Sequence, residues 1–164
     1  MKEKNMTYYL IISAVLAALT VIMTMIVQVP LGAGYFNLGD AVLMIGGLLL
    51  GPQWGFLIGG IGSALADIFA GWANYALFTF FVKGLEGFLA GYLFHRFHNR
   101  LAAVIPAGLV MALGYFIVDS ILYDVAAATA SIGGNLLQGL IGAGVAFLLY
   151  PLVQRALASS RAKL

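Results

Sequence analysis

The sequence predicts an all-α integral membrane protein, a bundle of six transmembrane helices formed by one domain over residues 1–164. The first observation is composition, because 63% of the residues are hydrophobic and only 9% are charged, whereas soluble domains carry roughly 25% charged residues. The second is the length of the charge-free runs, which are residues 5–39, 41–66, 68–82, 101–118 and 125–154. Several of these runs exceed the roughly 20 residues that span a bilayer as a helix, and none alternates apolar and polar residues as a β-barrel strand does.

The first three spans are bounded by residues that interrupt helices. The first is expected at residues 7–29 and ends at Pro30, and its length favours a retained span over a cleaved signal peptide. The second, residues 38–50, is short and stops at Gly51 and Pro52, a pair typical of a helix end. The third is expected at residues 53–70, before a turn at residues 71–74.

The last three spans are separated by one polar loop and one loop of small residues. We expect them at residues 75–94, 101–125 and 135–157, with loops at residues 95–100 and 126–134. His95 and His98 lie in the polar loop, but two histidines among basic residues are weak grounds for a metal site. We interpret this loop as a determinant of topology and expect no metal ion.

Basic residues predict the orientation. Apart from Lys83, they form three groups: Lys2 and Lys4; Arg96 and Arg100; Arg155, Arg161 and Lys163. Six spans place all three groups on one side, and loops rich in Lys and Arg face the cytoplasm. We therefore expect both termini in the cytoplasm and the protein in the cell membrane of a bacterium.

Polar residues gather near the outer ends of the spans. A charge inside a membrane costs about 2.5–3.5 kcal/mol on insertion scales, so it needs a partner or a function. The cytoplasmic half of the predicted spans contains almost no such polar residues. This distribution favours a pocket that opens outward over a channel that crosses the membrane. The candidate substrate-binding residues are Asn37, Asp40, Asp67, Trp72, Asn74, Tyr75, Lys83, Glu86, Tyr115, Asp119, Asn135 and Gln138.

Helical spacing joins these polar residues to small ones. Residues three and four apart share a helix face, and small residues allow membrane helices to approach closely. The sequence therefore predicts helices that pack tightly toward the cytoplasm and separate toward the outside. The three stripes are Lys83, Gly87 and Gly91; Gly55, Gly59, Ser63 and Asp67; and Gly108, Ala112, Tyr115, Asp119 and Tyr123.

Each candidate also has a structural interpretation. Lys83 and Glu86 are three residues apart and can neutralise each other, and Lys83 can instead pair with Asp67 or Asp119. The other structural alternatives are helix caps and an aromatic belt at the membrane surface: Asp40, Asp124 and Asn135 as caps, and Trp72 and Tyr75 in the belt.

Several function classes lack their motifs. The chain has no cysteine, and it contains neither a P-loop nor a dinucleotide fingerprint. It shows no serine in a nucleophile elbow and no inverted repeat of the kind found in many secondary transporters. We therefore expect a non-enzymatic binding subunit without a cofactor, although an enzyme using Asp67, Glu86 or Asp119 stays open.

Two stretches carry a resemblance to a known family. YFNLGDAVLMIGGLLLGPQWGFLIGGIGSALADIFAG (residues 35–71) and FTFFVKGLEGFLAGYL (residues 78–93) resemble the substrate-binding S components of energy-coupling factor (ECF) vitamin transporters. The resemblance implies six helices with cytoplasmic termini and a micronutrient bound near the outer face. It also implies a transmembrane coupling protein and two ABC-type ATPases as partners, and no nucleic acid partner. Members of the family are expected to topple in the membrane in order to release their substrate inside.

The resemblance also implies a docking motif in the first span. The family carries an Ala-x-x-x-Ala motif that docks on the coupling protein, and Ala14 and Ala18 have this spacing. A more polar stripe lies roughly 100° around the helix, made of Ser13, Ala17, Thr20, Thr24 and Gln28. The alternative is that Ala14 and Ala18 pack within the chain.

The charge balance narrows the substrate. The outer half holds one lysine and five acids, which disfavours a strongly anionic ligand because a carboxylate needs cations. Aromatic side chains can stack on a flat ring, so a neutral or weakly basic heteroaromatic fits best. The pattern is most similar to the branch associated with hydroxymethylpyrimidine, the thiamine precursor, and vitamin B6.

Alternatives to this substrate and this function remain. Riboflavin, pantothenate or another vitamin is the second choice of substrate, and a stand-alone transporter or channel is the second choice of function. Our hypothesis is that Lys83 and Glu86 line the pocket or brace its floor, with Asp67 and Asp119 as counter-charges for Lys83.

Overall fold

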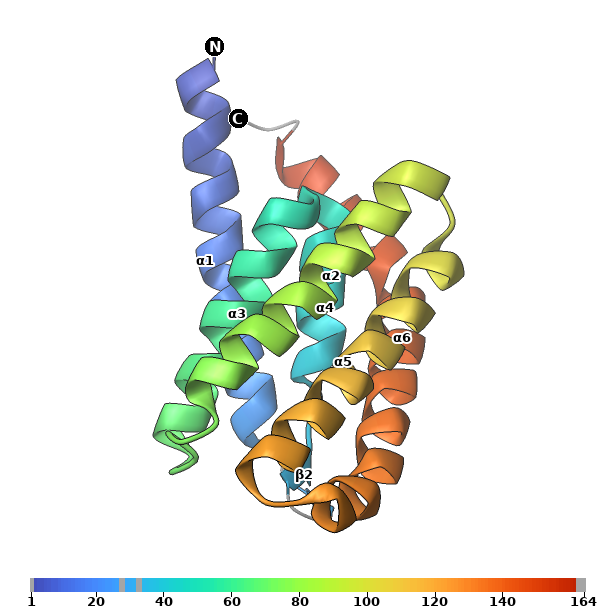
Figure 1. Cartoon of the computed structure of the whole chain (residues 1–164). Coiled ribbons are helices and arrows are strands. Elements are labelled where there is room, and N and C mark those ends of the chain that lie inside the picture. Colours follow the sequence, from blue (N-terminus) through green and yellow to red (C-terminus); the bar gives the residue numbers. More distant parts are fainter. Residues whose placement is uncertain (1, 27–28, 32–33, 162–164) are drawn as a thin grey trace.

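The computed structural model describes residues 2–26, 29–31 and 34–161, which form six helices and one short hairpin. The elements are α1 (Lys2–Ile26), β1 (Val29–Leu31), β2 (Gly34–Phe36), α2 (Gly39–Leu50), α3 (Pro52–Phe69), α4 (Ala76–Phe97), α5 (Arg100–Leu122) and α6 (Val125–Arg161). Figure 1 shows that α1 begins and α6 ends at the same end of the bundle. We call this the terminal end, and we call the opposite end, which carries the hairpin, the hairpin end.

The helix positions agree with the sequence pattern apart from two differences. The loop expected at residues 126–134 is wrong, because these residues form the first turns of α6. The alanine-rich start of this segment has high helix propensity, and the Asp124 side chain accepts a hydrogen bond from the Ala127 N–H at 2.7 Å, which caps the helix. The segment between the first two expected spans contains an antiparallel pairing of β1 and β2, with Val29 opposite Phe36 and Leu31 opposite Gly34.

Hydropathy identifies the chain as a membrane protein. Within the described residues, four helical segments are long and apolar enough to cross a bilayer, namely Met6–Ile26, Ala76–Phe97, Arg100–Leu122 and Val125–Ser159. Many large apolar side chains on these helices are exposed, as expected where lipid rather than water surrounds a helix bundle.

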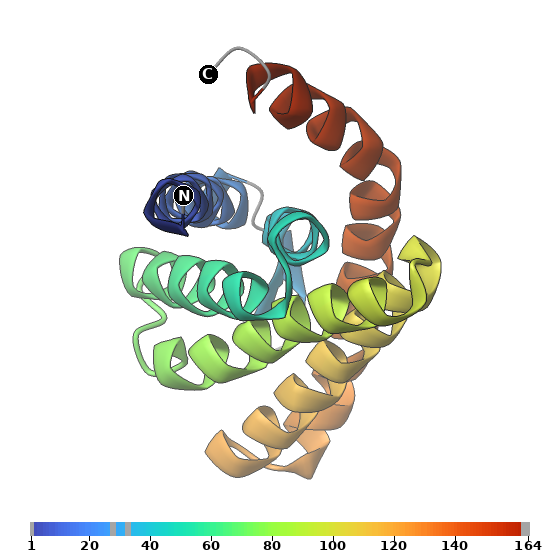
Figure 2. The same ribbon diagram turned by 90° about the horizontal axis from the view of Figure 1, so that it is seen from above.

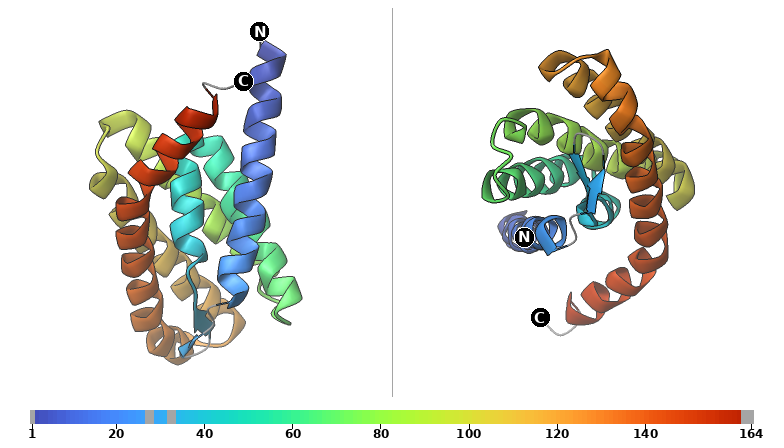
Figure 3. Two further views of the ribbon diagram at one scale, coloured as in Figure 1. Left: turned by 180° about the vertical axis from the view of Figure 1, so that it is seen from behind. Right: turned by 90° about the horizontal axis from the view of Figure 1, so that it is seen from below.

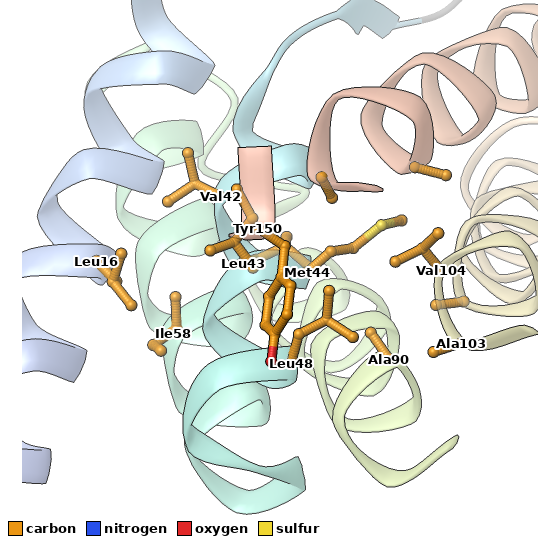
Figure 4. Close-up of a cluster of buried hydrophobic side chains, with 14 residues drawn as sticks. Leu16, Val42, Leu43, Met44, Leu48, Ile58, Ala90, Ala103, Val104 and Tyr150 are labelled. Atoms are coloured by element: carbon orange, nitrogen blue, oxygen red, sulfur yellow. The ribbon is translucent and has the colours of Figure 1, made fainter. Parts of the chain in front are cut away.

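The short helix α2 forms the centre of the bundle. Every residue from Gly39 to Leu48 is buried, and seen from above α2 lies between α1, α3, α4 and α6 (Figure 2). A helix that is apolar on all sides is expected in such a core. Figure 4 shows Leu43, Met44 and Leu48 of α2 packed among Ile58, Ala90 and Val104 of neighbouring helices, and this packing fixes the start of α2 at the hairpin end.

Glycines hold α2, α3 and α4 in close contact toward the terminal end. A Cβ atom added at Gly47 or Gly55 would collide with the backbone carbonyl of Gly87, and one added at Gly87 would collide with that of Gly55. Gly108 of α5 and Gly139 of α6 face each other in the same way, because a Cβ added at either would lie about 3 Å from backbone atoms of the other. The close approach predicted from the small-residue stripes is confirmed.

The last helix curves around the bundle. Figures 2 and 3 show α6 bending as it passes from the hairpin end to the terminal end, and Pro151 lies inside it. Proline removes a helix hydrogen bond and favours bending. The long α6 therefore contributes both to the hairpin end and to the terminal end.

Candidate functional site

A cavity lies at the hairpin end, where all six helices or the turns between them contribute side chains. The cavity has a volume of about 60 Å³, several times the roughly 10–15 Å³ that one water molecule needs. Its lining residues are Thr24, Asn37, Ser63, Asp67, Trp72, Tyr75, Thr79, Lys83, Tyr115, Asp119, Ser131, Asn135 and Gln138. Polar and aromatic side chains thus converge on one cavity.

Lys83 reaches the cavity from the first turns of α4, and its ammonium group is bound by two carboxylates that do not line the cavity. Its Nζ donates to Asp40 Oδ1 of α2 and, at 3.2 Å, to Glu86 Oε2 one turn further along α4. The exposed fractions of these side chains are 3% for Lys83 and 0% for both acids. Such a buried cluster persists because each charge has a close partner.

Two expectations about this cluster are corrected. Lys83 pairs with Asp40 and Glu86, not with Asp67 or Asp119, because the first turn of the central helix α2 brings Asp40 directly to it. Asp40 is fully buried, its carboxylate is bonded to Lys83 and Gln138, and Leu38 occupies the N-cap position of α2. Its interpretation as a surface helix cap is therefore wrong.

Gln138 links this cluster to the start of α2. Its Nε2 donates to both carboxylate oxygens of Asp40 at 3.1 Å. Its Oε1 accepts from the backbone N–H of Asn37 at 3.1 Å, and Asn37 Oδ1 in turn accepts from the Gly39 N–H at 2.9 Å. One amide of α6 therefore fixes both the Asp40 carboxylate and the backbone that leaves the hairpin.

Asp119 is the centre of a second polar cluster. The Tyr75 hydroxyl donates to Asp119 Oδ1 at 2.8 Å, and the Ser131 hydroxyl donates to Asp119 Oδ2. Burial and the hydrogen bond to this carboxylate raise the pKa of the Tyr75 phenol above its ordinary value. These bonds connect the turn before α4 with α5 and with the first turns of α6.

Aromatic rings form part of the cavity wall. Trp72 and Tyr75 make an edge-to-face pair with ring centroids 6.1 Å apart. The Tyr115 hydroxyl donates a hydrogen bond to Thr79 Oγ1 at 3.1 Å. The Lys83 Nζ lies 5.6 Å from the centre of the Tyr115 ring. Ring faces are favourable surfaces for flat heteroaromatic ligands and for cations.

The structure brings most of the predicted site residues together. Three of them do not line the cavity: Asp40 and Glu86 lie behind Lys83, and Asn74 is exposed in the turn before α4. The nine that line it are Asn37, Asp67, Trp72, Tyr75, Lys83, Tyr115, Asp119, Asn135 and Gln138.

Asn135 lies inside α6 rather than at its beginning. Its interpretation as an N-cap is therefore wrong. The exposed Asp124 caps this helix instead, which agrees with its interpretation as a helix cap.

Four further lining residues were missing from the predicted set. Thr24 and Ser63 lie on helical stripes that the sequence already showed, and Thr79 lies four residues before Lys83 on the same face of α4. Ser131 was missed because its segment was expected to be a loop. Serine and threonine by themselves do not identify a binding site in a sequence. They become candidates only when helical spacing places them on the same helix face as a charged residue.

The outer face of α1 is open to its surroundings. Ala14 and Ala18 are exposed, whereas Ser13, Thr20 and Thr24 are buried. The described contacts therefore do not support packing of the two alanines within the chain. The inward orientation of the polar stripe is confirmed for these three residues, and Gln28 lies outside the described residues.

These features define a helical membrane protein with a polar and aromatic cavity near one end. Comparison with known families gives the class: residues 4–155 match the profile of the ECF-type riboflavin transporter, S component. The chain belongs to this family and is a substrate-binding subunit of a transporter for a vitamin or a vitamin precursor.

Two relatives cover most of the chain. One is the thiamine precursor transporter HmpT of Lactococcus lactis subsp. cremoris, 32% identical over 158 residues, which is 94% of this chain and 92% of the relative. The other is an uncharacterised protein of Pyrococcus woesei, 38% identical over 135 residues, which is 77% of this chain and 90% of the relative. The family resemblance seen in the sequence is confirmed.

Proposed function

We propose that this S component captures a small heteroaromatic vitamin precursor, hydroxymethylpyrimidine in the first place and vitamin B6 in the second. The substrate enters at the outer face and is delivered inward when the subunit is coupled to its ATPase module. The observation that carries the proposal is the cavity at the hairpin end, with polar groups and aromatic rings around a small space. The name of the relative HmpT points to the same substrate class.

The size of the cavity supports a single ring over a larger vitamin. A cavity of about 60 Å³ is only several times the roughly 10–15 Å³ that one water molecule needs. One substituted pyrimidine or pyridine ring matches this room, whereas riboflavin has three fused rings and a long side chain. The family profile carries the name of riboflavin, and riboflavin is therefore the second candidate that the experiments below include.

The lining suggests how such a ring is recognised. We assign the contacts with the ring face to Trp72 and Tyr75, and those with its edge to Asn135, Gln138 and Asp67, because all five line the cavity. Asp40 and Glu86 act on the substrate only through Lys83, because neither lines the cavity. We therefore assign these two acids to the floor of the site.

Orientation follows from charge. All six helices cross the membrane in this proposal, and the terminal end faces the cytoplasm because the basic residues cluster there. The hairpin end and its cavity then face outward, in the cell membrane. A single domain over the whole chain and an absence of catalysis are part of the same proposal.

The partners follow from the family. We assign a transmembrane coupling protein and two ABC-type ATPases to this chain, with Ala14 and Ala18 as the docking stripe on α1. Their exposure in the middle of an apolar helix supports this role, since small residues allow another helix to approach closely.

Native mass spectrometry of the purified protein is the first test of the substrate. We expect a retained mass equal to hydroxymethylpyrimidine, or to a form of vitamin B6, after expression in medium containing either compound. Retention of riboflavin in its place would refute the single-ring proposal. Release of a chemically changed ligand would indicate an enzyme.

Docking is tested by replacing Ala14 and Ala18 with leucine and co-expressing the chain with a coupling protein and ATPases. We expect loss of the assembled complex with ligand affinity unchanged, because the stripe lies outside the cavity. Ala102→Leu, at another exposed alanine, is the matched control. Substrate flux into liposomes by the chain alone would instead indicate a stand-alone transporter.

A further inference from the structure

Lys83 is the only lysine or arginine in the described lining of the cavity. It is also the only one in the sequence between residues 5 and 95, and residues 101–154 contain none. Its side chain lines the cavity, yet only 3% of it is exposed. The cavity is therefore the route by which a further partner reaches its ammonium group.

The hydrogen bonds of this ammonium group are incomplete. A lysine ammonium carries three N–H donors. Within the described residues, two oxygens accept from it, Asp40 Oδ1 and Glu86 Oε2. A further contact is the Tyr115 ring, whose centre lies 5.6 Å from Nζ. A buried donor without an acceptor is costly, so we expect the third N–H to take an acceptor from the cavity.

The two carboxylates hold this donor in a fixed position. Neither Asp40 nor Glu86 belongs to the lining, so the acceptors that are present lie behind the ammonium group. Asp40 is itself held by two hydrogen bonds from Gln138 Nε2 at 3.1 Å. The three N–H bonds of an ammonium group point in different directions. Two acceptors behind it therefore leave the third N–H directed toward the cavity.

The charge of Lys83 is already balanced. Asp40 alone neutralises the ammonium group, whichever protonation state Glu86 holds. A carboxylate or phosphate on the substrate would find no second lysine or arginine in the described lining, and a buried anion needs a cation of its own. An uncharged acceptor needs only the donor. The site therefore favours a neutral hydrogen-bond acceptor over an anionic group.

We propose that Lys83 donates its third N–H to an unprotonated ring nitrogen of the substrate. This inference rests on the proposed function and specifies the chemical group that the site recognises. Both candidate substrates, a pyrimidine and a pyridine, contain a ring nitrogen. Its lone pair lies in the plane of the ring, so the ring edge can meet Lys83 while the ring faces remain open to Trp72 and Tyr75. A protonated ring nitrogen has no lone pair and would not accept this bond.

The test is a calorimetric titration of the purified full chain in detergent, at a pH above the pKa of the pyrimidine ring so that the ligand is neutral. Hydroxymethylpyrimidine is compared with its benzyl alcohol analogue, which keeps the amino, methyl and hydroxymethyl groups and has C–H in place of both ring nitrogens. We expect the analogue to bind at least about tenfold more weakly, because it loses a hydrogen bond from a charged donor.

A variant without the donor assigns this loss to Lys83. The triple variant Lys83→Met, Asp40→Asn, Glu86→Gln removes the ammonium group without leaving buried charges behind. In this variant the two ligands should bind within about threefold of each other. Lys4→Met is the matched control, because Lys4 lies in the first turns of α1, at the opposite end of the bundle from the cavity (Figure 1). It should keep the wild-type discrimination between the two ligands.

Nitrogen NMR of the bound ligand tests the inference without any variant. Isotope-labelled hydroxymethylpyrimidine is bound to the wild-type chain, and we expect one ring nitrogen to show the small shift of a hydrogen-bond acceptor. Protonation of a ring nitrogen gives a shift several times larger, so the two states are distinct. This measurement decides the matter even where the triple variant fails to fold.

Three outcomes would overturn the inference while leaving the proposed function intact. Equal affinity of the wild-type chain for the two ligands would show that no ring nitrogen is recognised. The same discrimination in the triple variant would assign the contact to another residue. A shift typical of full protonation would show that the ligand binds as a cation. Binding of riboflavin, with no binding of hydroxymethylpyrimidine or vitamin B6, would instead refute the proposed function itself.

Discussion

The two ends of α4 are built in opposite ways. Toward the terminal end, Gly87 and Gly91 bring its backbone against Gly47 and Gly55 of α2 and α3. Toward the hairpin end, Thr79 and Lys83 extend polar side chains into a cavity. The backbone contact with α3 continues as far as Lys83 and Phe80, which lie against Gly59 and Gly60. On its cavity side, however, the same end of α4 presents polar side chains in place of glycines.

This difference shows how a membrane bundle can contain a polar site. Lipid is as apolar as leucine, so close packing rather than the hydrophobic effect holds membrane helices together. The glycine contacts provide that packing at the terminal end and fix the helices relative to one another. The hairpin end can then hold buried acids and a lysine whose mutual positions depend on that packing.

The largest expected effect comes from disrupting the glycine contact. Gly87→Leu places a large side chain where the Gly55 carbonyl already lies, and we expect a loss of more than about 3 kcal/mol in the free energy of unfolding, or no folded protein. The measurement is the thermal-unfolding midpoint and the fraction of monodisperse protein in detergent. Gly144→Leu is the control, because no atom lies within 4 Å of a Cβ added there. Equal stability of the two variants would show that the contact is dispensable.

The next effect comes from removing the buried cation. Lys83→Met leaves Asp40 and Glu86 without their partner, and breaking a buried ion pair in this way costs about 3–5 kcal/mol. The triple variant Lys83→Met, Asp40→Asn, Glu86→Gln should regain most of that stability in the same thermal assay. A triple variant no more stable than Lys83→Met would indicate that charge is not the cause.

Cutting one hydrogen bond of the second cluster should cost less. Tyr75→Phe removes the donor to Asp119, and a lost hydrogen bond to a buried charged group is worth about 1–3 kcal/mol. We expect a lower unfolding midpoint and weaker ligand binding, since Tyr75 also lines the cavity. Tyr92→Phe, at an exposed position on α4, should change neither quantity.

The smallest effect is expected at the exposed acid of the hairpin end. Asp124→Ala removes the cap at the start of α6, which costs about 0.5–2 kcal/mol. Ligand affinity should hold, because Asp124 does not line the cavity. A loss of affinity comparable to that of Tyr75→Phe would mean that the start of α6 controls the site through its position alone.

Local patterns in the sequence are sufficient to predict the membrane class, the approximate position of five helices and most of the cavity lining. Charge-free runs and proline or glycine breaks are signals that need no knowledge of neighbouring helices. The three- and four-residue spacing joins Asp67 to Gly55 and Asp119 to Gly108 on common helix faces. The family resemblance likewise lies in contiguous stretches around Asp40 and Lys83.

Which charges meet depends instead on how the helices pack. Asp40 and Lys83 are 43 residues apart, and Asp40 and Gln138 are 98 residues apart. Periodicity shows which side of its own helix a residue occupies, but not which neighbouring helix that side faces. The glycine contacts among α2, α3 and α4 make that choice, because they set the rotation and height of each helix. They turn Asp40 toward Lys83 and leave Asp67 on the cavity wall, while the contact of Gly108 with Gly139 holds α5, which carries Asp119, against α6.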